Sequence, residues 1–98
     1  MQITYANNKI EKVCTDLHVA VRRHGKQIGE MIHQRIREIS AAESVELLVQ
    51  YHIGNCHDLH GDRAGQYAMD LTKNWRLIFK KVQNRLQVVC VIEITDYH

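Results

Sequence analysis

Cysteine, net charge and long apolar runs are all scarce in this chain of 98 residues. Cys14, Cys56 and Cys90 are odd in number and have no paired spacing, which argues against a disulfide framework and fits a reducing compartment. No apolar stretch approaches the ~20 residues that a membrane-spanning helix needs, and the first residues lack the apolar core of a signal peptide. We therefore expect a soluble cytoplasmic protein.

The net charge of +2 is too small to indicate nucleic-acid binding by itself, although the seven histidines could raise it under mildly acidic conditions. Any basic surface must therefore come from local clustering. The hydrophobic share of 45% and the charged share of 24% are ordinary for a globular protein. A chain of this length supports one modest core, so residues 1–98 are predicted to form a single domain without a repeat or a linker.

The first half of the sequence shows helical periodicity after a short β-branched start. Residues 2–5 are predicted to form a strand, and Asn7 or Asn8 can cap the helix that follows. Apolar residues recur at helical spacing up to Gly25, and a second stripe follows, which predicts a two-helix hairpin turning near Gly25. Residues 43–49 add a further helical turn. The stripes consist of Ile10, Val13, Leu17, Ala20 and Val21, and of Ile28, Ile32, Ile36 and Ile39.

From Gly54 onward the apolar residues alternate instead. A short strand and a charged turn are predicted first, and then strands within residues 66–71, 74–82 and 85–95, with a hairpin turn at residues 83 and 84. The last strand is almost continuously apolar, so we expect a central strand that is covered on both faces. The fold class is therefore α+β: an N-terminal strand and a helical hairpin packed on a mainly antiparallel, twisted β-sheet.

Cations gather on the predicted strands and turns of this second half. Trp75, Leu77 and Phe79 would face the core, so Arg76, Ile78 and Lys80 would lie on the opposite face. Arg63, Lys73, Arg76 and Lys80 together could hold phosphate groups. For Lys80 and Lys81 we favour a plainer interpretation, in which lysines protect a solvated sheet edge.

His57 and His60 stand three residues apart beside Cys56. These residue types bind zinc, but a structural zinc site needs two pairs of ligands, and the other cysteines fall in a predicted helix and a predicted central strand. We therefore expect no metal. Surface histidines without a function are common, and the alternative is that these imidazoles transfer protons or contact phosphates.

Asp96, Tyr97 and His98 end the chain with a carboxylate, a phenol and an imidazole. They could be a polar tail that frays beyond the last strand. The alternative is chemical: a carboxylate can orient or accept a proton, a phenol can donate a hydrogen bond to a developing charge, and an imidazole can protonate a leaving oxygen. A strand that runs directly into these residues would hold them on a rigid support.

The segment from Cys56 to Phe79 and the last three residues together resemble toxins of the RelE/ParE superfamily of toxin–antitoxin systems, most closely the HigB type. The shared pattern is a histidine before L-x-G-D-R-x-G, a strand with N-W-R-L-x-F, and a C-terminal D-Y-H. It is carried here by His57, Leu59, Gly61, Asp62, Arg63, Gly65, Asn74, Trp75, Arg76, Leu77, Phe79, Asp96, Tyr97 and His98. The pattern covers the second half of the chain, and the helical hairpin fits the same architecture less specifically.

The resemblance implies a RelE-like, microbial-RNase-like fold and an mRNA endoribonuclease that cuts transcripts on the ribosome, without a metal or another cofactor, and so inhibits translation. The catalytic residues would be His57, Asp96, Tyr97 and His98, with Arg76 on the phosphate. Substrate would also contact His60, Arg63 and Lys73. The partner would be a HigA-like helix-turn-helix antitoxin, through which alone the protein would reach operator DNA.

One departure from the family pattern bears on activity. HigB-like toxins often carry a lysine where this sequence has His60, and a proline where it has Asp58. Because a histidine is only partly charged at neutral pH, the hold on RNA would be weaker or pH-dependent. Two alternatives therefore stay open: a ParE-like toxin that inhibits DNA gyrase, and a non-catalytic relative that binds RNA or protein.

Overall fold

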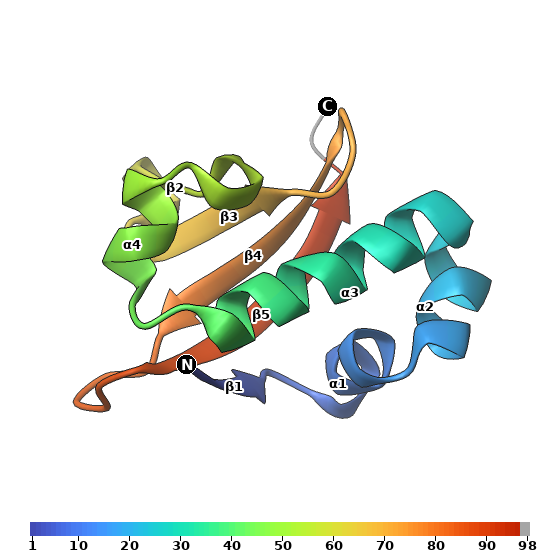
Figure 1. The fold of residues 1–98 in the computed structure, drawn as a ribbon, viewed down its shortest axis with the longest axis horizontal. Coiled ribbons are helices and arrows are strands. Elements are labelled where there is room, and N and C mark those ends of the chain that lie inside the picture. Colours follow the sequence, from blue (N-terminus) through green and yellow to red (C-terminus); the bar gives the residue numbers. More distant parts are fainter. Residues whose placement is uncertain (97–98) are drawn as a thin grey trace.

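The computed structural model describes residues 1–96, which form one five-stranded β-sheet with the α-helices on one of its faces (Figure 1). The elements in chain order are β1 (Gln2–Tyr5), α1 (Asn8–Thr15), α2 (Leu17–His24), α3 (Lys26–Ala41), α4 (Val45–Gln50), β2 (His57–Asp58), β3 (Gln66–Asp70), β4 (Trp75–Lys81) and β5 (Val88–Asp96), with single 3-10 turns at Ile53–Asn55 and Gly61–Arg63. The strand order is β1-β5-β4-β3-β2, with β1 parallel to β5 and the other pairs antiparallel. The predicted α+β class is confirmed.

The first predicted helix is in fact two helices, and Asp16 separates them. Its backbone is extended (φ −128°, ψ 109°), and its side chain accepts hydrogen bonds from the amides of His18 and Val19 at the start of α2. An aspartate in this position is a strong N-cap, so it starts a second helix where the apolar spacing alone suggested continuity. Asn7 caps α1 by accepting from the Ile10 amide, and Gly25 separates α2 from α3, as predicted.

The core lies between the helices and one face of the sheet. Ile32 and Ile39 of α3 are fully buried there against Leu77 and Phe79 of β4 and Val91 of β5. Each such side chain contributes about 1.5–3 kcal/mol through removal from water. The predicted facing of Trp75, Leu77 and Phe79 toward the core is confirmed. Among residues 1–96, none of the helices is long and apolar enough to cross a bilayer.

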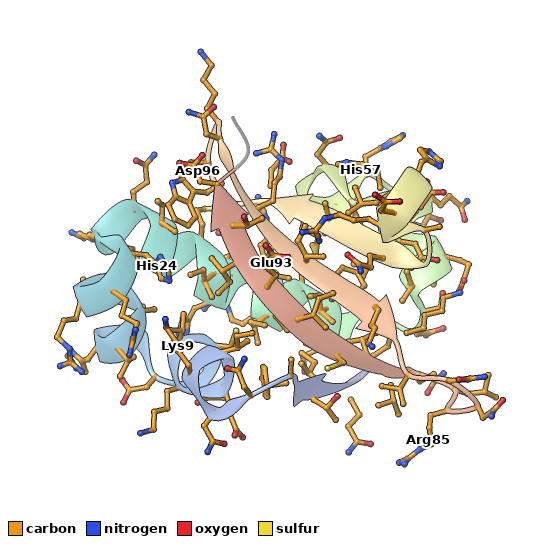
Figure 2. All side chains as sticks on the ribbon, turned by 180° about the vertical axis from the view of Figure 1, so that it is seen from behind. Lys9, His24, His57, Arg85, Glu93 and Asp96 are labelled. Atoms are coloured by element: carbon orange, nitrogen blue, oxygen red, sulfur yellow. The ribbon has the colours of Figure 1, made fainter. Side chains whose placement is uncertain are left out.

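Within residues 1–96, no helix covers the second face of the sheet, so the expectation that β5 is covered on both faces was half wrong. β5 is central, between β1 and β4, but Figure 2 shows β4 and β5 in front with the α-helices behind them. Residues Ile92 to Thr95 are accordingly only half-buried. The apolar stripes of the helices in residues 1–96 all pack on the same face of the sheet, so none of these helices covers the opposite face.

A β-bulge in β5 decides which of its side chains reach that open face. Ile78 pairs with Glu93, but Phe79 pairs with Val91, so Ile92 is an extra residue without an opposite partner. The extra residue resets the alternation of the strand. Val91 and Ile94 can therefore both pack on the helix side. Glu93 consequently lies on the open face.

Gly29 of α3 tests how closely the helices of the hairpin approach each other. A Cβ atom at this position would lie 2.9 Å from the backbone nitrogen of Val21 in α2, which is too close for any real contact. We expect Gly29→Ala to reduce the free energy of unfolding by about 1–3 kcal/mol, because the helices must separate. Urea unfolding followed by circular dichroism measures this change.

Gln27→Ala is the matched control, because Gln27 is exposed on the same helix. Equal unfolding midpoints for the two variants would contradict the close approach of α2 and α3.

Candidate functional site

Three polar residues from three strands share the open face of the sheet. His57 of β2 pairs with Ala68 of β3, which pairs with Ile78 of β4, which pairs with Glu93 of β5. Residues opposite one another across strands point to the same side of a sheet. Arg76 lies two residues from Ile78 along β4 and therefore joins this face. Figure 2 labels His57 and Glu93 on the side turned away from the helices.

Arg76 is fixed by the turn between β3 and β4. Its Nη1 donates to the main-chain oxygens of Thr72, Lys73 and Trp75 at 3.0–3.1 Å, and its Nε lies 2.9 Å from Oδ1 of Asp70. Only 20% of the side chain is exposed. A planar guanidinium can serve this many acceptors at once, which a lysine cannot. The sequence-predicted phosphate ligand is thus a positive charge held in one orientation.

His57 presents one ring nitrogen to solvent in a defined state. Its Nδ1 lies 2.8 Å from the main-chain oxygen of Asn55, and the residue is exposed. A carbonyl oxygen can only accept, so Nδ1 carries the hydrogen in this contact, and the lone pair of the neutral ring is on Nε2. His57 is therefore suited to accept a proton from a bound molecule.

Arg63 extends from the turn before β3 across the open face. Its Nη2 lies 2.7 Å from Oε1 of Glu93, and its Nη1 donates to Oε1 of Gln66 at 2.8 Å. Both charged side chains are about one third exposed, at 35% and 38%. Sequence reasoning singled out Arg63 but missed Glu93, although a lone carboxylate inside the apolar run of β5 was a visible signal.

The other predicted substrate contacts lie around this face. His60 is exposed directly before the 3-10 turn that carries Arg63, and Lys73 is exposed in the turn that holds Arg76. Lys80 is exposed on β4, opposite Gln66 and Cys90, on the same face as Arg76. Lys81 instead forms an ion pair with Glu46 of α4. Arg63, Arg76 and Lys80 therefore share this face, and Lys73 lies in the turn beside it. β4 lies between β3 and β5, so the interpretation of Lys80 and Lys81 as protection of a sheet edge was wrong.

The end of β5 reaches Arg76 but divides its residues between the two faces. Thr95 is the partner of Arg76, whereas Asp96 is the partner of Trp75, whose side chain packs on the core side. Asp96 is exposed at the end of the strand. The end of β5 therefore lies beside Arg76, but Asp96 stands at a position that faces the opposite side of the sheet from Arg76. Tyr97 and His98 lie outside the described residues.

Cys56, the thiol next to His57, is buried. Burial raises the pKa of Cys56 to about 12, so it is a protonated thiol at neutral pH and a poor metal ligand. Within residues 1–96, no group of three or more histidines, cysteines or carboxylates is placed to hold a metal ion.

Comparison with known proteins supports the fold. No protein-family model matches the sequence, and no curated protein matches it. A YoeB/ParE toxin from Agrobacterium tumefaciens has a similar structure, with a TM-score of 0.66, 19% identity and 100% of both chains covered. A YoeB–YefM complex from Staphylococcus aureus has a TM-score of 0.65 and 16% sequence identity, with 100% of this chain and 97% of that chain covered. The H87Q mutant of YafQ from E. coli has a TM-score of 0.53 and 16% sequence identity, with 97% of this chain and 91% of that chain covered.

The chain therefore has the fold of YoeB/ParE-type toxins, as the RelE/ParE resemblance implied. These similar structures are YoeB or YafQ toxins, so the finer HigB assignment rests on the sequence pattern alone.

His24 gives a pH prediction for the region where β5 ends. It lies in the last turn of α2, with its ring edge-on to Trp75 at 5.4 Å between centroids. Burial, with smaller effects from Arg23 and Lys9, lowers its pKa below the usual 6.5. The folded state therefore binds fewer protons than the unfolded state, and this contribution to stability falls as the pH drops below about 6.5.

We expect His24→Gln to show a smaller loss of unfolding free energy between about pH 7 and pH 5 than the wild type, because glutamine does not titrate. Urea unfolding at several pH values measures it. His18→Gln is the control for the same change of residue type, since His18 is exposed on the same helix. Identical slopes in all three proteins would refute the role of His24.

Proposed function

We propose that this protein is the toxin of a type II toxin–antitoxin system and cuts messenger RNA on the ribosome. The observation that carries the proposal is the arrangement on the open face: His57 presents Nε2, Arg76 is fixed beside the end of β5, and Arg63 and Lys80 add positive charge. An open sheet face suits a polymeric substrate. The YoeB/ParE-type fold is consistent with this activity, but a fold alone does not define a function.

The proposed reaction uses the RNA 2′-hydroxyl as nucleophile. A base takes its proton, the 2′-oxygen forms a bond to phosphorus, and the bond from phosphorus to the 5′-oxygen breaks, leaving a 2′,3′-cyclic phosphate and a 5′-hydroxyl. His57 Nε2 is suited to the base role, and Tyr97 or His98 to protonation of the 5′-oxygen; each transfer is typically worth ~10²–10⁴ in rate.

Arg76 stabilises the additional negative charge on the phosphorane in this mechanism, since its orientation does not change during the reaction. The reaction accordingly needs no metal ion. His60, Arg63 and Lys73 would hold neighbouring phosphates. Free RNA should react slowly, because orientation on the ribosome supplies much of the reduction in the barrier.

The proposed partner is a HigA-like helix-turn-helix antitoxin in the same cytoplasm, and only through it would operator DNA be contacted. The S. aureus YoeB of similar fold was solved in complex with YefM, which supports an antitoxin partner in general. A ParE-like inhibitor of DNA gyrase is the second candidate, because one similar structure is named YoeB/ParE. The paired placement of His57 and Arg76 favours RNA cleavage over this alternative.

Cells that express the protein should contain transcripts with new 5′ ends clustered inside open reading frames, because cleavage would require translation. Mapping of 5′ ends genome-wide measures this. His57→Gln should remove the clusters, whereas His18→Gln, an exposed change on α2, should retain them. Growth inhibition without such ends, together with loss of supercoiling activity in a gyrase assay, would decide for the ParE-like alternative.

Deletion of Tyr97 and His98 should abolish growth inhibition and leave the fold intact. The apolar residues of β5 that pack on or against the core are Val89, Val91 and Ile94, all of which the deletion preserves. Growth curves after induction, with circular dichroism and thermal unfolding of the purified variant, measure both effects. A truncated protein that remains fully toxic would contradict the catalytic role of these two residues.

A further inference from the structure

Asp70, at the end of β3, touches three separate elements. Its Oδ1 is buried, 2.9 Å from Nε of Arg76, in an ion pair without the alignment of a hydrogen bond. Its Oδ2 accepts from Nδ2 of Asn55 at 3.2 Å. Its main-chain oxygen accepts from Nε of Arg35 in α3 at 2.7 Å. One carboxylate thus joins the fixed guanidinium on β4 to the segment that precedes β2.

The segment that precedes β2 has an unusual backbone. His52, Gly54 and Asn55 all have positive φ, at 53°, 58° and 55°. Non-glycine residues adopt this left-handed conformation uncommonly, although asparagine and histidine do so more readily than most. Two contacts hold the segment: the Arg35 side chain packs so closely on Gly54 that a Cβ there would meet its Nε at 2.6 Å, and the Asn55 side chain is bound to Asp70.

Asn55 also holds His57. The main-chain oxygen of Asn55 is the acceptor for Nδ1 of His57, so the residue whose side chain binds Asp70 also sets the ring orientation and tautomer of the histidine. A continuous chain of contacts therefore runs from Arg76 through Asp70 and Asn55 to His57. Two residues that the proposed reaction needs are therefore positioned by a single carboxylate, one oxygen of which is buried.

We infer that Asp70 and Asn55 are positioning residues, which set the imidazole of His57 relative to the guanidinium of Arg76 on the open face. This inference rests on the proposed function, because it assigns the pair a role in that reaction. Neither residue needs to touch RNA. Such indirect contacts matter because a displacement of about 1 Å in a reacting group can cost ~100-fold in rate.

Asn55→Gly isolates the side-chain link. Glycine adopts positive φ without strain and keeps the main-chain oxygen, so only the bond to Asp70 is lost. Asn84→Gly is the matched control, because Asn84 also has positive φ, at 62°, and is exposed in the turn between β4 and β5. Asp70→Asn removes the charge beside Arg76, and Glu43→Gln, at an exposed residue before α4, controls for that change in charge.

The first measurement is the tautomer of His57 by ¹⁵N NMR of the imidazole, which does not require activity. The wild type and both controls should hold the hydrogen on Nδ1, whereas Asn55→Gly and Asp70→Asn should give a mixture of tautomers. A single Nδ1–H tautomer in all five proteins would overturn the inference.

The second measurement is transcript cleavage on translating ribosomes as a function of pH. Asn55→Gly and Asp70→Asn should lower kcat about 10–100-fold with little change in KM, and shift the pH profile, while the controls match the wild type. A loss of rate explained by a smaller folded fraction, with the pH profile unchanged, would also overturn the inference. If the wild type cuts no RNA, the proposed function fails, and the NMR result alone decides whether Asp70 and Asn55 position His57.

Discussion

Helix packing on only one face of the sheet is the constraint on which the rest of this structure depends. All of the apolar helix stripes pack on one side. The other side of β3, β4 and β5 (Figure 2) carries polar side chains together with Ala68 and Ile78, which are fully buried. The bulge at Ile92 makes this division possible, because it lets Val91 and Ile94 both reach the core. Without the extra residue, strict alternation would turn Ile94 outward and Glu93 into the core, where an unpaired carboxylate is costly. The same irregularity that completes the core thus supplies the open face with Glu93.

The open face is organised by ion pairs and main-chain acceptors rather than by mobile surface charges. Arg76 is bound to three carbonyl oxygens and a carboxylate, and Arg63 is bound to Glu93 and Gln66. Ordering two long side chains in advance means that a bound phosphate does not have to immobilise them. A preorganised positive charge is also what stabilises a transition state most effectively. Under the proposed function, the stability of the β3–β4 turn and the reactivity of the face would therefore depend on the same guanidinium.

The sequence predicts those parts of this arrangement that follow from local periodicity. The side of Arg76 followed from its place after Trp75, and the helical hairpin from apolar spacing around Gly25. The break at Asp16 was missed, since the apolar spacing continues across it and only the capping geometry ends α1. Asp70 and Asn55 were missed because their contact joins residues 15 positions apart, and Arg35 reaches Asp70 from 35 positions away. Pairings of this kind depend on how elements pack, and no local pattern encodes them.

The charge balance of the face bears on why the proposed toxin activity would need the ribosome. Non-specific affinity for RNA grows with the number of phosphates that cations neutralise. Here the chain has a net charge of only +2, and two cations of the face already pair with carboxylates, Arg63 with Glu93 and Arg76 with Asp70. A phosphate that binds Arg63 must compete with the carboxylate of Glu93, so contacts to the backbone of free RNA gain little. Under the proposed function, the ribosome would then supply the orientation that binding energy does not. The carboxylate of Glu93 would in this way restrict cleavage to RNA that is already held in place.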